Sequence, residues 1–184
     1  MATDNSILLV DTSSFITLVE SRAERLLYER PETIWVPEHV LTEIKQDPAK
    51  TELHRAMHSG DVYIDATDQF NTHLPYFKAA SFHLNEKTYY RAGEMLWSGD
   101  TALIGRGLSM ENVIIVTDDG YVRSRCDDLN LDVTGSLGIL IEAVKEGIAS
   151  LEEAAQCLSD IEEGSGWFNQ GLLDQVRKEI QEVR

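Results

Sequence analysis

Two short apolar runs that each end in acidic and hydroxyl residues constrain the fold of this chain more than any other feature. Residues 7–10 lead directly into Asp11-Thr12-Ser13-Ser14, and residues 113–116 lead into Thr117-Asp118-Asp119-Gly120. Both runs have the length and the β-branched content of strands that are buried on both faces, as in a parallel sheet covered by helices. Ligands of such sheets bind in the crevice outside the carboxyl ends of the strands. The sequence therefore predicts a polar site where these two strands end.

Carboxylate oxygens are the ligands that this predicted site offers. Neither a glycine-rich loop nor a cysteine accompanies the two strand ends. Two carboxylates about 4 Å apart repel each other by roughly 4 kcal/mol at an effective dielectric constant near 20, so a cluster of them needs a cation. Mg²⁺ and Mn²⁺ prefer such oxygen ligands, and they activate water and stabilise in-line displacement at phosphorus. The pattern indicates metal-dependent phosphate chemistry.

Strand and helix patterns alternate along most of the chain. Further short strands are expected near residues 34–36, 62–64 and 131–133, with helical patterns between them, whereas residues 65–88 are the least legible. This alternation predicts βαβ units and a parallel sheet. From Ser150 onward the strand signal ends, and residues 150–153 (Ser-Leu-Glu-Glu) have the form of a capping box that opens a helix. We therefore predict a sheet domain over residues 1–148 and a helical extension over residues 149–184, packed on that domain or on a partner.

The composition favours a cytoplasmic protein with no membrane partner. The two cysteines, Cys126 and Cys157, do not resemble a disulfide framework, so a reducing compartment is expected. The first residues do not resemble a signal peptide, and the apolar runs fall short of the roughly 20 residues needed to cross a bilayer.

The strong acidity of the chain leaves two interpretations of its partners open. Acidic residues outnumber basic ones 32 to 16, which gives a net charge of −16, whereas binding to a phosphate backbone normally depends on Lys and Arg. Either the protein does not bind nucleic acid, or it works in high salt, where repulsion is screened over a few ångströms. In the second case a local basic rim would have to come from scattered arginines: Arg22, Arg25, Arg30, Arg106, Arg123 and Arg125.

Each acidic candidate also has an ordinary structural explanation. Asp11 could cap the first helix, and Asp100, after Ser98-Gly99, favours a helix N-terminus whatever its function. Asp119-Gly120 is common turn chemistry, and Glu43 could be a solvated helix residue. Buried strand ends nevertheless tolerate a polar group poorly unless it has a role. Taken together, the acids favour a functional site.

The order and spacing of these acids resemble the PIN-domain nucleases. Asp11 follows the first strand, Glu43 lies in the helix after Pro37, Gly99-Asp100 opens a later helix, and residues 117–119 follow the fourth strand. The chain is most similar to a prokaryotic PIN branch described as predicted nucleic-acid-binding proteins. That branch shares a Gly-acid helix start, an Asp-Asp-x-x-x-Arg segment (here 118–123), a segment Gly, Ser or Thr, Leu-Gly-x-Leu (here 135–140, with Ser) and a helical tail. The resemblance covers nearly the whole chain apart from residues 65–88.

The resemblance implies a three-layer α/β/α sandwich around a parallel sheet of four to five strands, with a C-terminal helical tail. It also implies phosphodiester cleavage, usually of RNA, with Mg²⁺ or Mn²⁺ as cofactor. The acids that it places at the metal site and in catalysis are Asp11, Glu43, Asp100 and a fourth, either Asp119 or Asp118, of which we favour Asp119. Ser13 and Thr117 could orient the carboxylates or a bound water. Arg123 could face the scissile phosphate or form a salt bridge with Asp119 or Asp127 on its own helix.

The function expected on these grounds is a metal-dependent endoribonuclease, with the toxin of a toxin–antitoxin pair as one role. Its partners would be RNA and, for a toxin, an antitoxin protein, and the amphipathic tail makes a homodimer plausible. One alternative is a non-catalytic PIN-fold module that binds nucleic acid or protein. Another is an acidic α/β phosphatase that acts on a small phosphorylated ligand. A zinc protease is disfavoured, because His54 and His58 have helical spacing but lack the Glu between them that such a site needs.

Overall fold

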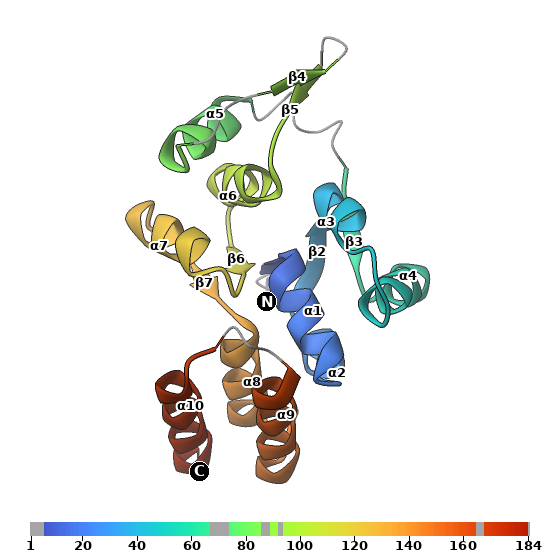
Figure 1. Ribbon diagram of the computed structural model, residues 1–184, viewed down its shortest axis with the longest axis vertical. Helices are drawn as coiled ribbons and strands as arrows, with labels where there is room; N and C mark the ends of the chain where they lie inside the picture. The colour runs from blue at the N-terminus through green and yellow to red at the C-terminus, as the bar shows by residue number, and fades with distance from the viewer. Residues whose placement is uncertain (1–5, 67–73, 86–88, 92–93, 165–167, 184) are drawn as a thin grey trace, which may run out of the picture.

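The computed structural model describes residues 6–66, 74–85, 89–91, 94–164 and 168–183. Its centre is a five-stranded parallel sheet with the strand order β3-β2-β1-β6-β7 (Figure 1). The strands are β1 (Ile7–Val10), β2 (Thr33–Pro37), β3 (Tyr63–Asp65), β6 (Val113–Val116) and β7 (Val133–Thr134). The predicted parallel sheet and its helical cover are confirmed.

Side chains that alternate along the strands pack against helices on the two opposite faces of the sheet. Leu8 and Val10 of β1 face a core shared with the helices α1 (Thr12–Glu20), α2 (Glu24–Tyr28), α4 (Ala49–Ser59) and α8 (Ser136–Lys145). Leu9 faces the opposite core, formed with α5 (Leu74–His83), α6 (Gly99–Ser109) and α7 (Gly120–Asp128). This period of two follows from the pleat of a strand, and it explains why the strands read as continuous apolar runs. The result is the expected α/β/α sandwich.

The chain reverses its direction across the sheet between β1 and β6. It first builds outward from β1 to β2 and β3, and then returns to the other side of β1 to add β6 and β7. β1 and β6 are parallel neighbours in register from Ile7–Val113 to Val10–Val116, so their carboxyl ends lie side by side. In an open α/β sheet this switch point is where ligands bind.

The helical segment that follows β1 is divided into two helices. α1 ends at Glu20 and α2 begins at Glu24, with Arg22 between them in a left-handed conformation (φ 55°). The Ser21 hydroxyl donates to Thr17 O (2.7 Å), and Ala23 N–H donates to Leu18 O (2.7 Å). The turn satisfies the last carbonyls of α1, and Leu26 and Leu27 of α2 are buried in the same core as Leu8 of β1.

The stretch that was illegible in the sequence contains α5 and, beyond it, an antiparallel hairpin of β4 (Tyr89–Arg91) and β5 (Glu94–Leu96). α5 packs on α6, where Gly105 makes the close approach possible. A Cβ atom at Gly105 would lie 2.9 Å from the ring carbon Cγ of Phe77, which is fully buried. This helix pair covers one face of the sheet.

The C-terminal tail forms α9 (Leu151–Gly164) and α10 (Gln170–Glu182), which lie beside α8 (Figure 1). The predicted capping box is confirmed: Glu153 N–H donates to Ser150 Oγ (3.2 Å), and Ser150 N–H donates to Glu153 Oε2 (2.9 Å). Leu158 of α9 and Val176 of α10 belong to the same core as β1. The boundary at residue 148 stays a prediction. None of the described helices is both long and apolar enough to cross a membrane.

A buried ion pair connects α6 to the last residue of β3. Arg106 Nη2 donates to Asp65 Oδ1 (2.9 Å), and Arg106 Nε lies 2.5 Å from Asp65 Oδ2. Both side chains are almost fully buried. Because α6 begins with Gly99 and Asp100, the pair helps to fix the helix that carries a candidate site residue.

We expect Arg106→Met to lower the free energy of unfolding by roughly 3–5 kcal/mol, because it leaves the buried Asp65 carboxylate without its guanidinium. The double variant Asp65→Leu/Arg106→Met should recover most of this loss, since it removes both charges together. Urea unfolding followed by circular dichroism measures both effects. A single variant as stable as the wild type would show that the pair does not hold α6.

Candidate active site

Asp11 is the central acid of the candidate site. It directly follows β1 and is only 8% exposed. Its Oδ2 accepts hydrogen bonds from Ser13 Oγ (2.7 Å) and from Thr117 Oγ1 (2.9 Å). Although Asp11 occupies the N-cap position of α1, its side chain makes no capping hydrogen bond. The capping explanation of Asp11 is therefore wrong, and its carboxylate is instead oriented by hydroxyls from the ends of two strands.

Thr117 connects Asp11 to Asp119. The threonine side chain is fully buried, and its hydroxyl, which donates to Asp11, also accepts from Asp119 N–H (3.2 Å). Asp119 is exposed, and its Oδ1 caps α7 by accepting from the N–H groups of Tyr121 (2.8 Å) and Val122 (3.0 Å). One carboxylate oxygen of Asp119 thus holds the helix, while the residue as a whole faces solvent at the carboxyl edge of β6.

Asp118 is turned towards α8. Its Oδ1 accepts from Ser136 N–H (2.8 Å), the first residue of that helix, and its own N–H donates to Ser13 Oγ (3.2 Å). Gly135 permits this approach, because a Cβ atom there would lie 2.6 Å from Asp118 Oδ1. The other oxygen, Oδ2, is buried and makes no hydrogen bond to the part of the chain that the structure describes. Asp118 therefore joins two elements of the fold.

Glu43 and Gly99 form a second contact at the same edge of the sheet. Glu43 ends α3 (Glu38–Glu43), and its Oε2 accepts from Thr12 Oγ1 (2.5 Å). Its Oε1 lies 2.6 Å from where a Cβ atom of Gly99 would stand, so a side chain at this position would displace the end of Glu43. Asp100 follows in the first turn of α6, which is capped by Ser98. The glycine of the Gly-acid motif thus has a steric reason.

These contacts bring the predicted residues to one edge without assembling a finished metal site. Hydrogen bonds link Asp11, Ser13, Thr117 and the backbone of Asp118 and Asp119. Thr12, the residue after Asp11, donates to Glu43. Across the described ranges, however, no group of three His, Cys, Asp or Glu side chains is placed so that it could hold a metal ion. The donors available at the edge are oxygens, which suit Mg²⁺ or Mn²⁺ and not a metal that prefers thiolates.

Arg123 points towards the end of β6. Its Nη1 donates to Thr117 O (3.3 Å), and a Cβ atom at Gly135 would lie 2.9 Å from the same nitrogen. Among the described residues, no ion pair joins Arg123 to Asp119 or Asp127, so the salt bridge considered from the sequence is not formed.

The arginines considered as a basic rim do not gather beside the acids, because several of them stabilise other parts of the fold. Arg106 is buried against Asp65, and Arg30 is paired with Glu32 (2.8 Å). Arg22 and Arg25 lie beyond the C-terminal end of α1, whereas Asp11 lies at its start. Of the proposed rim, only Arg123 and Arg125 belong to α7, the helix that follows the candidate acids.

His39 is a neighbour of the site that the sequence analysis did not identify. It lies one helical turn before Glu43 in α3. Burial lowers the pKa of His39, while the negative charge of Glu43 and a hydrogen bond with the Trp97 backbone oppose this shift. The spacing of four residues between His39 and Glu43 could have signalled the pair.

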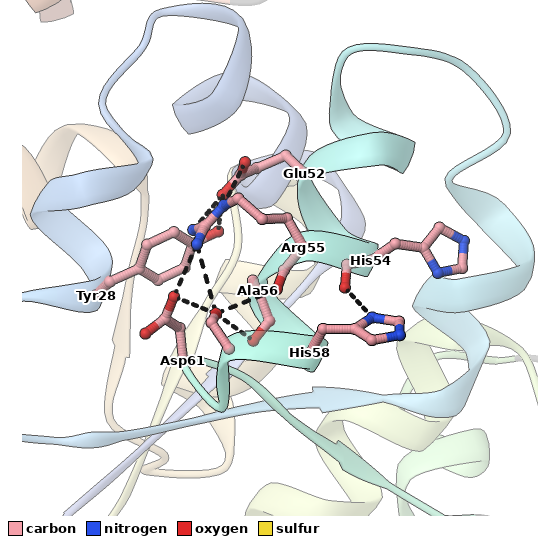
Figure 2. Close-up of polar contacts among 8 residues, drawn as sticks. Tyr28, Glu52, His54, Arg55, Ala56, His58 and Asp61 are labelled. Carbon is pink, nitrogen blue, oxygen red and sulfur yellow. Dashed lines mark hydrogen bonds and ion pairs between the residues drawn. The ribbon is translucent and has the colours of Figure 1, made fainter.

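Neither the histidine pair nor the cysteines provide an alternative centre. His58 Nδ1 is hydrogen-bonded to His54 O (2.7 Å), and Figure 2 shows both rings on the other side of α4 from the cluster of Tyr28, Glu52 and Arg55. Both side chains are exposed to solvent. Burial raises the pKa of the Cys126 thiol to about 11, and it also raises that of Cys157, so neither is a thiolate at neutral pH.

We expect Thr117→Val to lower the free energy of unfolding by about 1–3 kcal/mol, because the buried Asp11 carboxylate and the Asp119 N–H both lose a hydrogen-bond partner. Thr117→Ser is the matched control, since it keeps the hydroxyl and loses only one methyl group, at a cost of about 0.8 kcal/mol. Urea unfolding compares the two variants. If the valine variant were as stable as the serine variant, the hydroxyl would not be holding the two acids.

Comparison with known proteins assigns the chain to a family. A family model with the description "DUF3368: PIN domain" matches residues 7–182. Comparisons with curated proteins and with solved structures gave no match. PIN domains are typically nucleases, and they generally use divalent metal ions. The match spans the sheet, the acids at its carboxyl edge and both tail helices, and the chain therefore belongs to the PIN-domain family.

Proposed function

We propose that this protein is a divalent-metal-dependent endoribonuclease whose active site lies at the carboxyl ends of β1 and β6. The observation that carries the proposal is the Asp11 carboxylate, which is held by Ser13 and Thr117 at the switch point of a PIN-family sheet. A buried carboxylate that is oriented by hydroxyls and does not cap its own helix is available to a cation. RNA is the substrate that the family resemblance favours.

The acids proposed to hold Mg²⁺ or Mn²⁺ are Asp11, Glu43, Asp100 and Asp119. When bound, the ion would lower the pKa of a water molecule and stabilise charge that develops on the phosphate. Ser13 and Thr117 would keep the Asp11 carboxylate in one orientation. Because Mg²⁺ retains several waters, some of these acids would act through water molecules, which is compatible with the absence of a compact ligand cluster in the described residues.

We assign the fourth acid to Asp119 and a positioning role to Asp118. Asp119 is exposed and is linked to Asp11 through Thr117. Asp118 uses one oxygen for the first N–H of α8. Arg123 is likewise assigned a positioning role, because its guanidinium supports the carbonyl of Thr117.

The biological setting proposed here is a cytoplasmic one, in which the enzyme acts alone or as the toxin of a toxin–antitoxin pair. An antitoxin or a second copy of the chain would be its protein partner. The net charge of −16 disfavours a broad basic surface, so the proposed enzyme would contact nucleic acid only through a restricted set of groups near the acids.

We expect Asp11→Asn and Asp119→Asn to abolish Mn²⁺ binding and metal-dependent RNA cleavage, because each removes a charge from the proposed site. Asp118→Asn should retain measurable binding, since its amide oxygen can still accept from Ser136 N–H. Calorimetry with Mn²⁺ and cleavage of a labelled RNA measure both properties. Loss of binding in Asp118→Asn but not in Asp119→Asn would reverse the assignment of the fourth acid. Absence of Mn²⁺ binding by the wild type would favour a non-catalytic module.

We expect Gly99→Ala to weaken Mn²⁺ binding by about 10- to 100-fold, as for other residues that support metal ligands. The new methyl group would displace Glu43 Oε1, and the exposed end of that side chain can move without unfolding the protein. Gly164→Ala is the matched control, because a Cβ atom there would meet nothing within 4 Å. Unchanged Mn²⁺ affinity in Gly99→Ala would remove Glu43 from the proposed site.

A further inference from the structure

Helix α4 carries two histidines that the candidate active site does not use. His54 and His58 are both exposed, and they stand four residues apart in α4. Four residues of an α-helix turn through about 400°, so the two side chains lie on one face, with about 5–6 Å between their Cβ atoms. Figure 2 shows both rings on the same side of α4. The two imidazoles are therefore within reach of one small ligand.

A backbone carbonyl orients the ring of His58. His58 Nδ1 lies 2.7 Å from His54 O, and a carbonyl oxygen only accepts, so Nδ1 is the ring nitrogen that carries the hydrogen in this bond. In the neutral ring the lone pair that a ligand can use is then the one on Nε2. Histidines that bind a metal ion almost always donate their other ring N–H to a backbone carbonyl, a carboxylate or water. His58 thus makes the hydrogen bond that orients a metal ligand.

The guanidinium of the neighbouring arginine is turned away from this face. Arg55 pairs with Glu52 (2.7 Å) and Asp61 (3.1 Å), and Figure 2 shows that cluster on the opposite side of α4 from the two rings. Lys50 is exposed one turn before His54, and the flexible stem of a lysine lets its ammonium group move away from a bound cation. The net charge of −16 favours the approach of cations to the chain.

Imidazole nitrogens select a different class of metal ion from the carboxylates at the sheet edge. Mg²⁺ and Mn²⁺ prefer oxygen ligands, whereas Zn²⁺, Ni²⁺ and Cu²⁺ bind imidazole well. Two histidines at this spacing on one helix supply two of the zinc ligands in the H-E-x-x-H proteases. Within the described ranges no group of three His, Cys, Asp or Glu side chains could hold a metal ion, so water would fill the remaining coordination positions.

We propose that His54 and His58 form an accessory site for a borderline divalent transition-metal ion such as Zn²⁺ or Ni²⁺, in which His58 coordinates through Nε2. The site is separate from the proposed nuclease centre, because it lies on the solvent face of one helix and uses nitrogen ligands in place of carboxylates. Chelation ties two successive turns of α4 together. Only the folded helix holds the two rings on one face, so the ion binds the folded chain in preference to the unfolded one.

Calorimetry with Ni²⁺ tests the site, because this ion suits imidazole better than carboxylate ligands. The full chain is titrated in about 1 M NaCl, where a Debye length of about 3 Å screens the attraction of a cation to scattered surface acids. The wild type should bind a single Ni²⁺ ion per chain, and excess Mg²⁺ should not displace it. Displacement by Mg²⁺, or loss of Ni²⁺ binding in Asp11→Asn, would assign the ion to the acids and overturn the histidine site.

Substitutions test whether the two rings act together. His54→Gln and His58→Gln should each weaken Ni²⁺ binding by about 100-fold or more, because the second ligand of a chelate acts at a high effective concentration that either change removes. The double variant should bind little more weakly than either single variant. His83→Gln is the matched control and should bind as the wild type does, since His83 is an exposed histidine of α5 with Ala79 four residues before it. Two small, additive losses, or an equal loss in His83→Gln, would refute the chelate.

Two further readouts with Zn²⁺ locate the ion on α4. Nuclear magnetic resonance of the ring nitrogens identifies the coordinating atom, which for His58 should be Nε2, with Nδ1 keeping its hydrogen bond to His54 O. Coordination through Nδ1 would overturn the assignment. Zn²⁺ should also raise the Tm of the wild type and leave that of His58→Gln unchanged, because it stabilises only a chain that can chelate it. An equal rise of Tm in both proteins would exclude the histidine pair as the site.

Discussion

The parallel pairing of β1 with β6 is the contact on which the rest of the candidate site depends. The two strands are distant in sequence, yet Val10 pairs with Val116 in register, so the next residues, Asp11 and Thr117, meet at the same edge. The 2.9 Å hydrogen bond between their side chains follows directly from that register. A shift of one residue would turn alternate side chains to the opposite face and separate the pair. The site is thus a consequence of strand pairing and not of a flexible loop.

Hydroxyl groups, and not basic side chains, orient the central carboxylate. Ser13 and Thr117 both donate to Asp11 Oδ2, and these neutral donors leave the negative charge available. A guanidinium in the same place would satisfy the carboxylate and compete with a cation. The fold does use that solution elsewhere, where Arg106 neutralises Asp65 at the end of β3. Two aspartates at strand ends of one sheet therefore have different partners. Asp65 is neutralised by a guanidinium, whereas Asp11 accepts hydrogen bonds from neutral hydroxyls.

The sequence predicts the parts of this structure that depend on local pattern. The runs 7–10 and 113–116 are strands as expected, and the capping box at Ser150 forms as written. The break at Arg22 was not predicted, because the apolar stripe continues through it and only the packing of α2 requires the turn. The different hydrogen bonds of Asp118 and Asp119 could not be predicted from the sequence either, since the bond of Asp118 depends on the approach of α8 to the end of β6. Likewise the burial of Arg106 against Asp65 depends on tertiary packing that no local pattern reveals.

The acidity of the chain and its family membership are reconciled by how its arginines are used. Arg30 and Arg106 are buried in ion pairs, and Arg55 lies over the Tyr28 ring while it binds Glu52 and Asp61 (Figure 2). Guanidinium groups that are paired in this way contribute little to attracting a phosphate backbone. Cations bound by the carboxylates of the proposed site would supply, at the carboxyl edge of the sheet, the positive charge that these arginines do not.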